Sequence, residues 1–441
     1  MSGSLSDGAL ARRFVMLALV SLCAVPSFAQ NVGADRERAR EILRDIEKEL
    51  RRKYYDPTFG GKDLGAIFKL ANERVEAATS EAQISGIIIR ALLDLDDSHT
   101  FFIPPPLSFD VEYGFEMGMI GERCHVTDVD AGSLAEADGL RAGMAVLAIE
   151  GVTPSRANFW QIQYSLNIAR PRRELKMALQ APGKAPETKV IRAKVGPPRQ
   201  FQDFGEWIYD QIEKYRRSRY RPVRVAALGE KAAVLRLEEF DVEDREIHDA
   251  MESIHGKESL VLDLRDNPGG SVEVLERLVG CLFDREVRIG DRKGRKEAKP
   301  LVAKRQPPSR VFGGKLVVLV NAASASAAEV TARTVQLERR GAVVGDRTAG
   351  AVMVSRQWSY TQGHEYRFLT YGLSITDADL VMSDGQSLEK TGVVPDEVVL
   401  PTGEDLASGR DPVLAAAAQR VGASLDAEAA GKLFAGTIDG K

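Results

Sequence analysis

The stretch KLVVLVNAASASAAEV, residues Lys315–Val330, combines a short apolar run, a cluster of small residues and the beginning of a helical pattern. The continuous apolar run at 317–320 is typical of a strand that is covered on both faces of a sheet. The small residues from 321 to 328 indicate a tight turn. The sequence therefore predicts a buried strand, a turn and a helix start in immediate succession.

Ser324 and Ser326 lie in this turn and are candidate nucleophiles. A hydroxyl at the start of a helix is surrounded by amide donors and the positive end of the helix dipole, as acyl-transfer chemistry requires. The alternative is that both serines only cap the helix or fit the turn, as small polar residues commonly do. The turn alone does not decide between these interpretations.

A second predicted strand ends in a glycine turn at SLVLDLRDNPGG, residues Ser259–Gly270. Glycines there allow backbone amides to approach a ligand closely. The two stretches together resemble the C-terminal-processing, or tail-specific, serine peptidases, which carry a DLRxNPGG turn followed by a strand that ends in SASAxE. In that family the nucleophile stands three positions before the glutamate, which implies Ser326 before Glu329 and leaves Ser324 as a structural neighbour.

The segment LLDLDDSHTFFI, residues 92–103, places His99 directly after Ser98 at a predicted helix end. A histidine at a helix C-terminus usually has a structural role, because it interacts favourably with the helix dipole. This segment and the earlier Tyr54–Pro57 motif both resemble the N-terminal portion of the same peptidases. The resemblance implies a catalytic role for His99 instead.

The chain departs from the commonest form of the family at Ala351. Members with a Ser-Lys dyad carry their general-base lysine at the corresponding place, in a Gly-Lys-Gly-type turn. An alanine side chain cannot accept a proton, so another group serves as the base or the protein is inactive.

A second branch of the family, exemplified by the tricorn core protease, uses a serine and a histidine that are supported by another serine and a glutamate. The resemblance to this branch implies Ser326 as nucleophile, His99 as base, and Ser98 and Glu389 as the groups that orient the imidazole. An imidazole can accept a proton near neutral pH, provided that a polar group holds it in place.

The family also places an oxyanion hole on backbone amides of the NPGG turn and of the residue after the nucleophile. The implied donors are Ala327 and either Gly269 or Gly270. Gly269 is the first choice, although the sequence does not distinguish two adjacent amides.

Residues 107–196 resemble a PDZ domain of the bacterial protease type, through YGFEMG at 113–118 and VLAIEGV at 146–152. In such a domain a glycine-containing loop binds a terminal carboxylate and a strand edge pairs with an extended peptide. The alternative is a small β-rich domain with a closed groove. The implied substrate-binding residues are Gly114, Phe115, Glu116 and Met117. Phe115 and Met117 would favour an apolar terminal residue.

The chain has 441 residues, of which 44% are hydrophobic and 28% charged, and is long enough for several domains with cores. The resemblance covers roughly residues 35–400 and implies an α/β fold with a spiral strand-helix (crotonase-like) core. The predicted divisions are a signal peptide (1–29), a helical region with the Ser-His motif (30–106), the PDZ domain (107–196), the peptidase core (197–405) and a helical tail (406–441).

The N-terminus has arginines at positions 12 and 13, an apolar stretch at 14–25 and small residues at 27 and 29. The apolar stretch is too short to span a bilayer, and the small residues suit cleavage after Ala29. We therefore expect a secreted or periplasmic protein, with an uncleaved membrane anchor as the alternative. A leucine precedes Cys23 where lipid attachment usually needs a small residue, so lipidation is not expected.

Cleavage would leave Cys124 and Cys281, which lie in different predicted domains and are expected to be free buried thiols. Five scattered histidines and the lack of a Cys-x-x-Cys motif provide no argument for a metal site, and no cofactor is expected. A net charge of −4 gives no electrostatic case for nucleic acid or an anionic membrane as partner.

The function predicted from these observations is a secreted or periplasmic serine endopeptidase that cleaves near protein C-termini and recognises substrates through its PDZ domain. Its partners would be proteins or peptides with exposed C-termini, and a homo-oligomer is left open. One alternative is an inactive peptide-binding scaffold, which Ala351 favours. Another is a carrier of hydrophobic ligands, because interphotoreceptor retinoid-binding protein resembles the same core fold.

Two further segments carry structural expectations. Residues 284–314 are charged and predict an exposed excursion, with the basic cluster 292–304 as a solvated loop. Residues 411–434 are alanine-rich and predict an amphipathic helix that packs on the core or on a second protomer.

Overall fold

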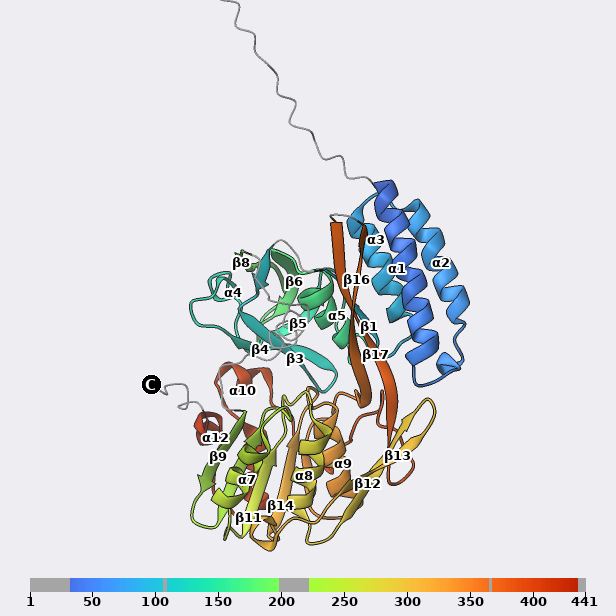
Figure 1. The fold of residues 1–441 in the computed structure, drawn as a ribbon. Helices are drawn as coiled ribbons and strands as arrows, with labels where there is room; N and C mark the ends of the chain where they lie inside the picture. The colour runs from blue at the N-terminus through green and yellow to red at the C-terminus, as the bar shows by residue number, and fades with distance from the viewer. Residues whose placement is uncertain (1–31, 106–108, 198–221, 365–366, 435–441) are drawn as a thin grey trace, which may run out of the picture.

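The computed structural model describes residues 32–105, 109–197, 222–364 and 367–434 (Figure 1). A bundle of helices and a small β-rich part lie side by side above a larger part that mixes strands and helices (Figure 1). A long two-stranded hairpin runs from the helices to the larger part. The predicted signal peptide lies outside the described residues.

The helical part lies within residues 30–106, where a helical region was predicted. Its helices are α1 (Val32–Lys53), α2 (Leu64–Ala77) and α3 (Glu81–Leu93), and a short turn η1 (Phe59–Gly61) follows α1. The side chains of Asp63 and Ser80 accept backbone hydrogen bonds and so cap α2 and α3. The three helices share a core with Tyr371 and Leu373 of strand β17. The long hairpin therefore completes the helical part.

A five-stranded sheet connects the helical part to the larger part. Its strands are β1 (Phe101–Ile103), β12 (Val287–Gly294), β13 (Ala298–Ala303), β16 (Met353–His364) and β17 (Arg367–Met382). The order is β1-β17-β12-β13, and β16 pairs with the other side of β17. Phe101 lies opposite Ser374 in the β1–β17 register, so the Ser98-His99 segment is held directly beside β17.

The expectation of an exposed loop within residues 284–314 is wrong. Within this segment, residues 287–294 and 298–303 form the antiparallel strands β12 and β13, followed by the turn η3 (Pro308–Arg310). Val287, Ile289 and Leu301 are buried against the core of the larger part. The charged residues conceal this pattern because they occupy the solvent-facing positions between the buried ones.

The β-rich part contains a five-stranded antiparallel sheet in the order β3-β4-β5-β6-β7 and a separate strand pair β2–β8. Its strands are β2 (Asp110–Glu112), β3 (Phe115–Ile120), β4 (Arg123–Val129), β5 (Ala145–Ile149), β6 (Glu174–Gln180), β7 (Glu187–Arg192) and β8 (Lys194–Gly196). Its helices are α4 (Leu134–Ala137), α5 (Phe159–Tyr164) and the π-helical turn η2 (Ser165–Ala169). The part has its own core, which includes Val126, Leu140, Leu175 and Met177.

The larger part is built on a six-stranded sheet in the order β18-β15-β14-β11-β10-β9, parallel except for the β9–β10 pair. Its strands are β9 (Val223–Leu228), β10 (Ala232–Leu237), β11 (Ser259–Asp263), β14 (Lys315–Val320), β15 (Ala342–Gly345) and β18 (Glu397–Val398). The predicted strand at 317–320 is confirmed as buried on both sides.

Helices cover both faces of this sheet, which explains the continuous apolar runs in β11 and β14. One face packs on α7 (Asp244–Ser253), α8 (Val272–Leu282) and α9 (Ala327–Leu337). The other face packs on α11 (Pro412–Arg420) and α12 (Ala427–Lys432), and α10 (Gly403–Ala407) precedes them. The single helix predicted for 411–434 is therefore two helices, and they pack on the core of their own chain.

Cys124 and Cys281 are both buried and unbridged, as predicted. None of the helices within residues 32–434 that the structure describes has the length and apolar character needed to cross a bilayer.

Candidate active site

The predicted nucleophile Ser326 lies in the turn between β14 and α9, immediately before the helix. Its backbone has φ +52° and ψ −117°, a conformation that a residue with a side chain rarely adopts. Its amide donates to the carbonyl oxygen of Ala351 at 2.9 Å and to Oε2 of Glu329 at 3.1 Å. Such strain is found where the surrounding structure holds a functional group in a required position.

Ser324 occupies a different environment from Ser326. Its side chain is fully buried, and its hydroxyl donates to the carbonyl oxygen of Leu264 at 2.7 Å. The same hydroxyl oxygen accepts a hydrogen bond from the amide of Asn321 at 2.9 Å. Ser324 therefore joins the end of β14 to the end of β11.

The NPGG turn lies directly against Ser326. A Cβ atom added to Gly269 would lie 2.6 Å from Cβ of Ser326 and 3.0 Å from the amide nitrogen of Ala327. Asn267 joins the two turns, because its carbonyl oxygen accepts from the amide of Ala325 at 2.8 Å. Gly269 must lack a side chain for this close approach.

The two glycine amides of the turn differ in their hydrogen bonding. The amide of Gly269 donates to Oδ1 of Asn267 at 2.8 Å. Within the described residues, the amides of Gly270 and Ala327 have no acceptor. Two unpaired donors thus lie at this turn and at the start of α9, beside Ser326.

Ser98, His99 and Glu389 form a chain of hydrogen bonds. The hydroxyl of Ser98 donates to Oε1 of Glu389 at 2.9 Å, and its oxygen lies 2.7 Å from Nδ1 of His99. Because the Ser98 proton is directed to the carboxylate, Nδ1 of His99 carries the proton that it shares with Ser98. Nε2 is then left with its lone pair, the form of imidazole that accepts a proton.

Burial changes the acid-base properties of this chain. It raises the pKa of Glu389 to about 7, although hydrogen bonds from Val352 and Ser98 oppose the shift. It lowers the pKa of His99, and the charge of Asp97 acts in the opposite direction. Neutral imidazole is therefore favoured near neutral pH.

The His99 chain and the Ser326 turn are connected through residues 351 and 352. The carbonyl oxygen of Ala351 accepts from the amide of Ser326, and the amide of Val352 donates to Oε2 of Glu389 at 2.9 Å. No direct hydrogen bond joins the side chains of His99 and Ser326 within the described part of the chain. Catalytic hydrogen bonds are often looser in a free enzyme than in its substrate complex.

Glu329 was used in the sequence only to set the position of Ser326, but it has a clear structural role. Its side chain is fully buried and accepts from the amides of Ser326, Gly350 and Ala351 and from the hydroxyl of Thr348. Burial nevertheless raises its pKa to about 7. The SASAxE pattern was the available signal for a residue that holds the nucleophile turn.

Lys390, the lysine next to Glu389, forms its ion pair with an exposed residue outside this network. Its ammonium group pairs with Asp96 at 2.5 Å, and both side chains are 57% exposed. Ala351 contributes only backbone groups to the contacts with Ser326 and Glu329.

The predicted peptide-binding residues lie in the β-rich part. Gly114 has φ +72° and precedes β3, which begins with Phe115 and Glu116. Phe115 and Met117 are half-buried against the core of this part, and Ala322 from the nucleophile turn packs on the same core. The β-rich part therefore touches the turn that leads to Ser326.

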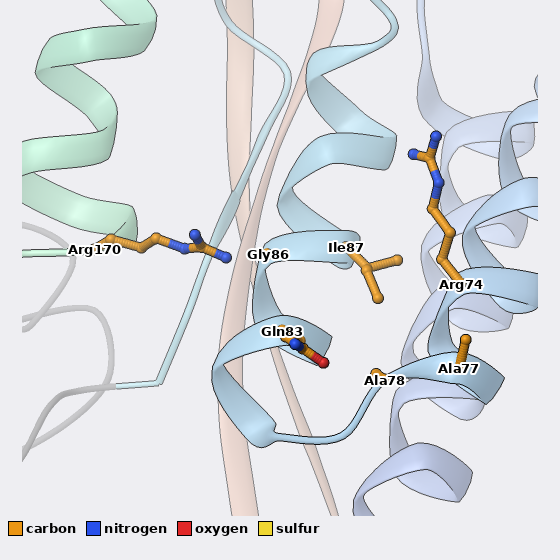
Figure 2. Close-up of a pocket in the computed structure, with 7 residues that line it drawn as sticks. All are labelled: Arg74, Ala77, Ala78, Gln83, Gly86, Ile87 and Arg170. Carbon is orange, nitrogen blue, oxygen red and sulfur yellow. The ribbon is translucent and has the colours of Figure 1, made fainter. Parts of the chain in front are cut away.

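A hollow of about 370 Å³ lies in the helical part (Figure 2). Arg170 reaches toward Gly86 of α3, while Arg74 approaches from α2 on the far side of Ile87 (Figure 2). None of the predicted catalytic residues lines this hollow. It is therefore separate from the site around Ser326.

Comparison with known proteins identifies similar peptidases. Residues 231–399 match Peptidase family S41. A carboxyl-terminal-processing protease of Picosynechococcus sp. (strain ATCC 27264 / PCC 7002 / PR-6) is 27% identical over 376 residues, which cover 82% of this chain and 83% of that protein. The chloroplastic C-terminal processing peptidase of Tetradesmus obliquus is 25% identical over 404 residues, covering 85% and 80%.

Solved structures of mature CPAF, one of them complexed with lactacystin, have a similar fold. Each has a TM-score of 0.63 and 15% sequence identity and covers 85% of this chain, together with 94% or 96% of CPAF. At this identity the likeness concerns the mixed α/β fold alone.

The matched domain and the serine at its strand-to-helix turn define the chain as a serine-type peptidase. Within that class, residues 231–399 resemble peptidase family S41, and the curated relatives are named for C-terminal processing.

Proposed function

We propose that this protein is an endopeptidase that cleaves near protein C-termini, with Ser326 as nucleophile and His99 as general base. The observation that carries the proposal is the hydrogen-bond chain from Glu389 through Ser98 to Nδ1 of His99. This arrangement corresponds to the Ser-His branch of the family exemplified by tricorn. It supplies a base where Ala351 cannot. The preference for C-termini is supported by the curated relatives, which are named for C-terminal processing.

In the proposed reaction, Oγ of Ser326 attacks the scissile carbonyl carbon while Nε2 of His99 takes the hydroxyl proton. The proton then passes from His99 to the leaving amine, and the acyl group remains on Ser326. A water molecule, activated by the same imidazole, hydrolyses the ester and restores Ser326. Ser98 and Glu389 hold the ring and stabilise its protonated form throughout.

The oxyanion that forms during attack requires donors that are free in the resting enzyme. We propose the amides of Ala327 and Gly270, because neither donates to an acceptor within the described residues. Gly269, the first choice from the sequence, is less suited to this role because its amide already donates to Asn267. Its contribution would be the space that it leaves beside Ser326.

The β-rich part is proposed to act as a PDZ-type domain that binds substrate C-termini. Support comes from its glycine loop before β3 and from the contact between its core and Ala322. The edge of β3 would pair with an extended peptide, and Gly114, Phe115, Glu116 and Met117 would contact its terminal residue. Charged replacements of Phe115 and Met117 should weaken binding of peptides with apolar C-termini. Equal affinity for free-acid and amidated peptides would exclude this role.

Secretion to the periplasm or outside the cell is also part of the proposal, and it rests on the signal-peptide pattern of residues 1–29. The predicted division of the chain into domains is proposed as well. A cell-fractionation experiment on the full chain, combined with N-terminal sequencing, tests both the location and cleavage after Ala29. Recovery of an uncleaved chain in the cytoplasm would contradict it.

The decisive experiment is fluorophosphonate labelling with peptide mapping. We expect labelling at Ser326 in the natural protein and in Ser324→Ala, and none in Ser326→Ala. Ser324→Ala should lower stability, because the Leu264 carbonyl and the Asn321 amide would lose a buried partner. The kcat of Ser326→Ala should fall roughly 10⁴–10⁶-fold.

The alternative function is an inactive peptide-binding scaffold, which the absence of a base side chain at Ala351 favours. It predicts that a folded protein is not labelled and that Ser326→Ala binds peptides as the natural protein does. Labelling of Ser326 would exclude it.

A further inference from the structure

A buried carboxylate lies beside His99 that the proposed reaction does not use. The side chain of Asp97 is only 4% exposed. Its Oδ1 accepts hydrogen bonds from the amides of His99 at 2.8 Å and Thr100 at 3.2 Å. This carboxylate therefore sets the turn of main chain from which the Ser98 and His99 side chains project.

The same carboxylate is bound from two other elements. The hydroxyl of Thr376, on β17, donates to Oδ1 of Asp97 at 2.9 Å, and the hydroxyl of Thr100 donates to Oδ2 at 3.3 Å. Both threonines are fully buried. Tyr54, just after α1, faces the carboxylate as well: burial raises the pKa of this tyrosine, and the negative charge of Asp97 adds to the shift. The helical part, β17 and the His99 turn thus meet at Asp97.

No lysine or arginine in the described ranges forms an ion pair with Asp97. The titratable groups that interact with it are His99, Tyr54, Tyr55 and Glu389. A buried charge without a counter-ion acts strongly on its neighbours, because little water is present to screen it. Here the charge raises the pKa of His99 against the effect of burial.

The adjacent Asp96 is different, although it belongs to the same turn. Its side chain is 57% exposed and pairs with Lys390. Its backbone has φ +56°, a conformation that asparagine also tolerates. Asp96 therefore provides a matched control for the loss of one negative charge near His99.

We propose that Asp97 is a positioning residue for the general base: it holds the main chain of the His99 turn and keeps a buried carboxylate beside the imidazole. The inference rests on the proposed function, in which His99 takes the proton from Ser326. Residues 95–100, with the sequence Leu-Asp-Asp-Ser-His-Thr, and Tyr54 would then share the role of holding the general base in place.

The test compares Asp97→Asn with Asp96→Asn in the full chain. Asparagine at 97 keeps Oδ1 and its three hydrogen bonds, and the hydroxyl of Thr100 can rotate to accept from the new amide group. The acidic limb of the kcat/KM profile should move to lower pH by about 0.5–1 unit in Asp97→Asn. The limb should not move in Asp96→Asn, because solvent already screens that charge.

The pKa of the His99 imidazole is measured separately by NMR in a Ser326→Ala background. It should fall by the same amount in Asp97→Asn. Thr376→Val, which keeps the shape but removes a donor to Asp97, provides a second variant. It should lower kcat roughly tenfold with KM unchanged, because the turn is held less firmly.

Three results separate the possible failures. If His99→Ala is inactive and the acidic limb of the kcat/KM pH profile does not shift in Asp97→Asn, the role of Asp97 is overturned and the proposed function stays intact. An active His99→Ala would overturn the proposed function, and the NMR titration would still decide whether Asp97 controls the imidazole. If Asp97→Asn does not fold, unchanged kcat in a folded Thr376→Val would overturn the inference.

Discussion

Replacement of Gly269 by alanine tests whether the NPGG turn closes one side of the site. Gly269 has φ +99°, and its added Cβ would lie 2.6 Å from Cβ of Ser326 and 3.0 Å from both Oγ of Ser326 and the amide nitrogen of Ala327. Real Cβ atoms do not approach other atoms within 3.0 Å, so one of the two turns must shift. The atoms that it meets belong to the start of α9, which cannot move like the end of a flexible side chain.

The expected loss has a conformational part and a packing part. Gly256→Ala is the matched control, because Gly256 has φ +82° but nothing lies within 4 Å of its added Cβ. The control should lose only about 1–2 kcal/mol of unfolding free energy from the left-handed backbone. Gly269→Ala should lose about 1–3 kcal/mol more from overpacking.

The activity of the two variants should differ much more than their stability. A displaced Ser326 or Ala327 amide should lower kcat/KM of Gly269→Ala by roughly 10²–10³, as the loss of an oxyanion donor does. Gly256→Ala should retain the natural value. Chemical denaturation measures stability, and initial rates on a peptide substrate measure activity. Equal activity in the two variants would refute the proximity of this turn to the reacting atoms.

Further predictions concern the base, the buried acid and the contact between parts. His99→Ala should lower kcat/KM more than a thousandfold, whereas Lys390→Ala should change it little, because Lys390 pairs with Asp96 in solvent. Full activity in His99→Ala together with loss of activity in Lys390→Ala would indicate a lysine base. Burial raises the pKa of Glu389 from 4.5 to about 7, so its contribution to stability is complete below pH 4.5 and is lost as the pH rises through about 7. Thermal unfolding between pH 5 and 8 should therefore show a smaller decline in Glu389→Gln, and an unchanged decline would contradict the shift. Arg156 of the β-rich part pairs at 2.7 Å with Asp346, which follows β15, and both side chains are largely buried. Arg156→Ala should lower the free energy of unfolding, measured by chemical denaturation, by about 3–5 kcal/mol. A loss below about 1 kcal/mol would show that solvent reaches the pair.

Local patterns in the sequence were sufficient to predict the strand and the turn that carry the candidate nucleophile. The run at 317–320 is apolar at every position because helices cover both faces of β14, so its burial could be inferred without any knowledge of its partners. Ser326 was distinguished from Ser324 only through the family resemblance. The buried hydroxyl of Ser324, which donates to the carbonyl oxygen of Leu264, supports the proposed choice of Ser326 on independent physical grounds.

Charged segments were less informative. Strands β12 and β13 were missed because their solvent-facing positions carry many charges, and the helix predicted at the C-terminus proved to be two. In both cases the pairing with β17 or the packing on the central sheet decides the structure. Such partners are distant in the sequence, so local periodicity does not report them.

The sequence by itself determined the resemblance to C-terminal-processing peptidases, the order of the main elements and the residue types available for chemistry. Only the tertiary structure decided which of these groups meet. Ser98 and Glu389 are separated by 291 positions, yet their side chains share a hydrogen bond. The same is true of Asp97 and Thr376, which are 279 positions apart. The proposed preference for the Gly270 amide over that of Gly269 likewise rests on the Asn267 side chain, which accepts from Gly269. The physical reason is that hydrogen bonds and burial depend on distances in space, which the fold sets, for example by pairing β1, just after His99, with β17.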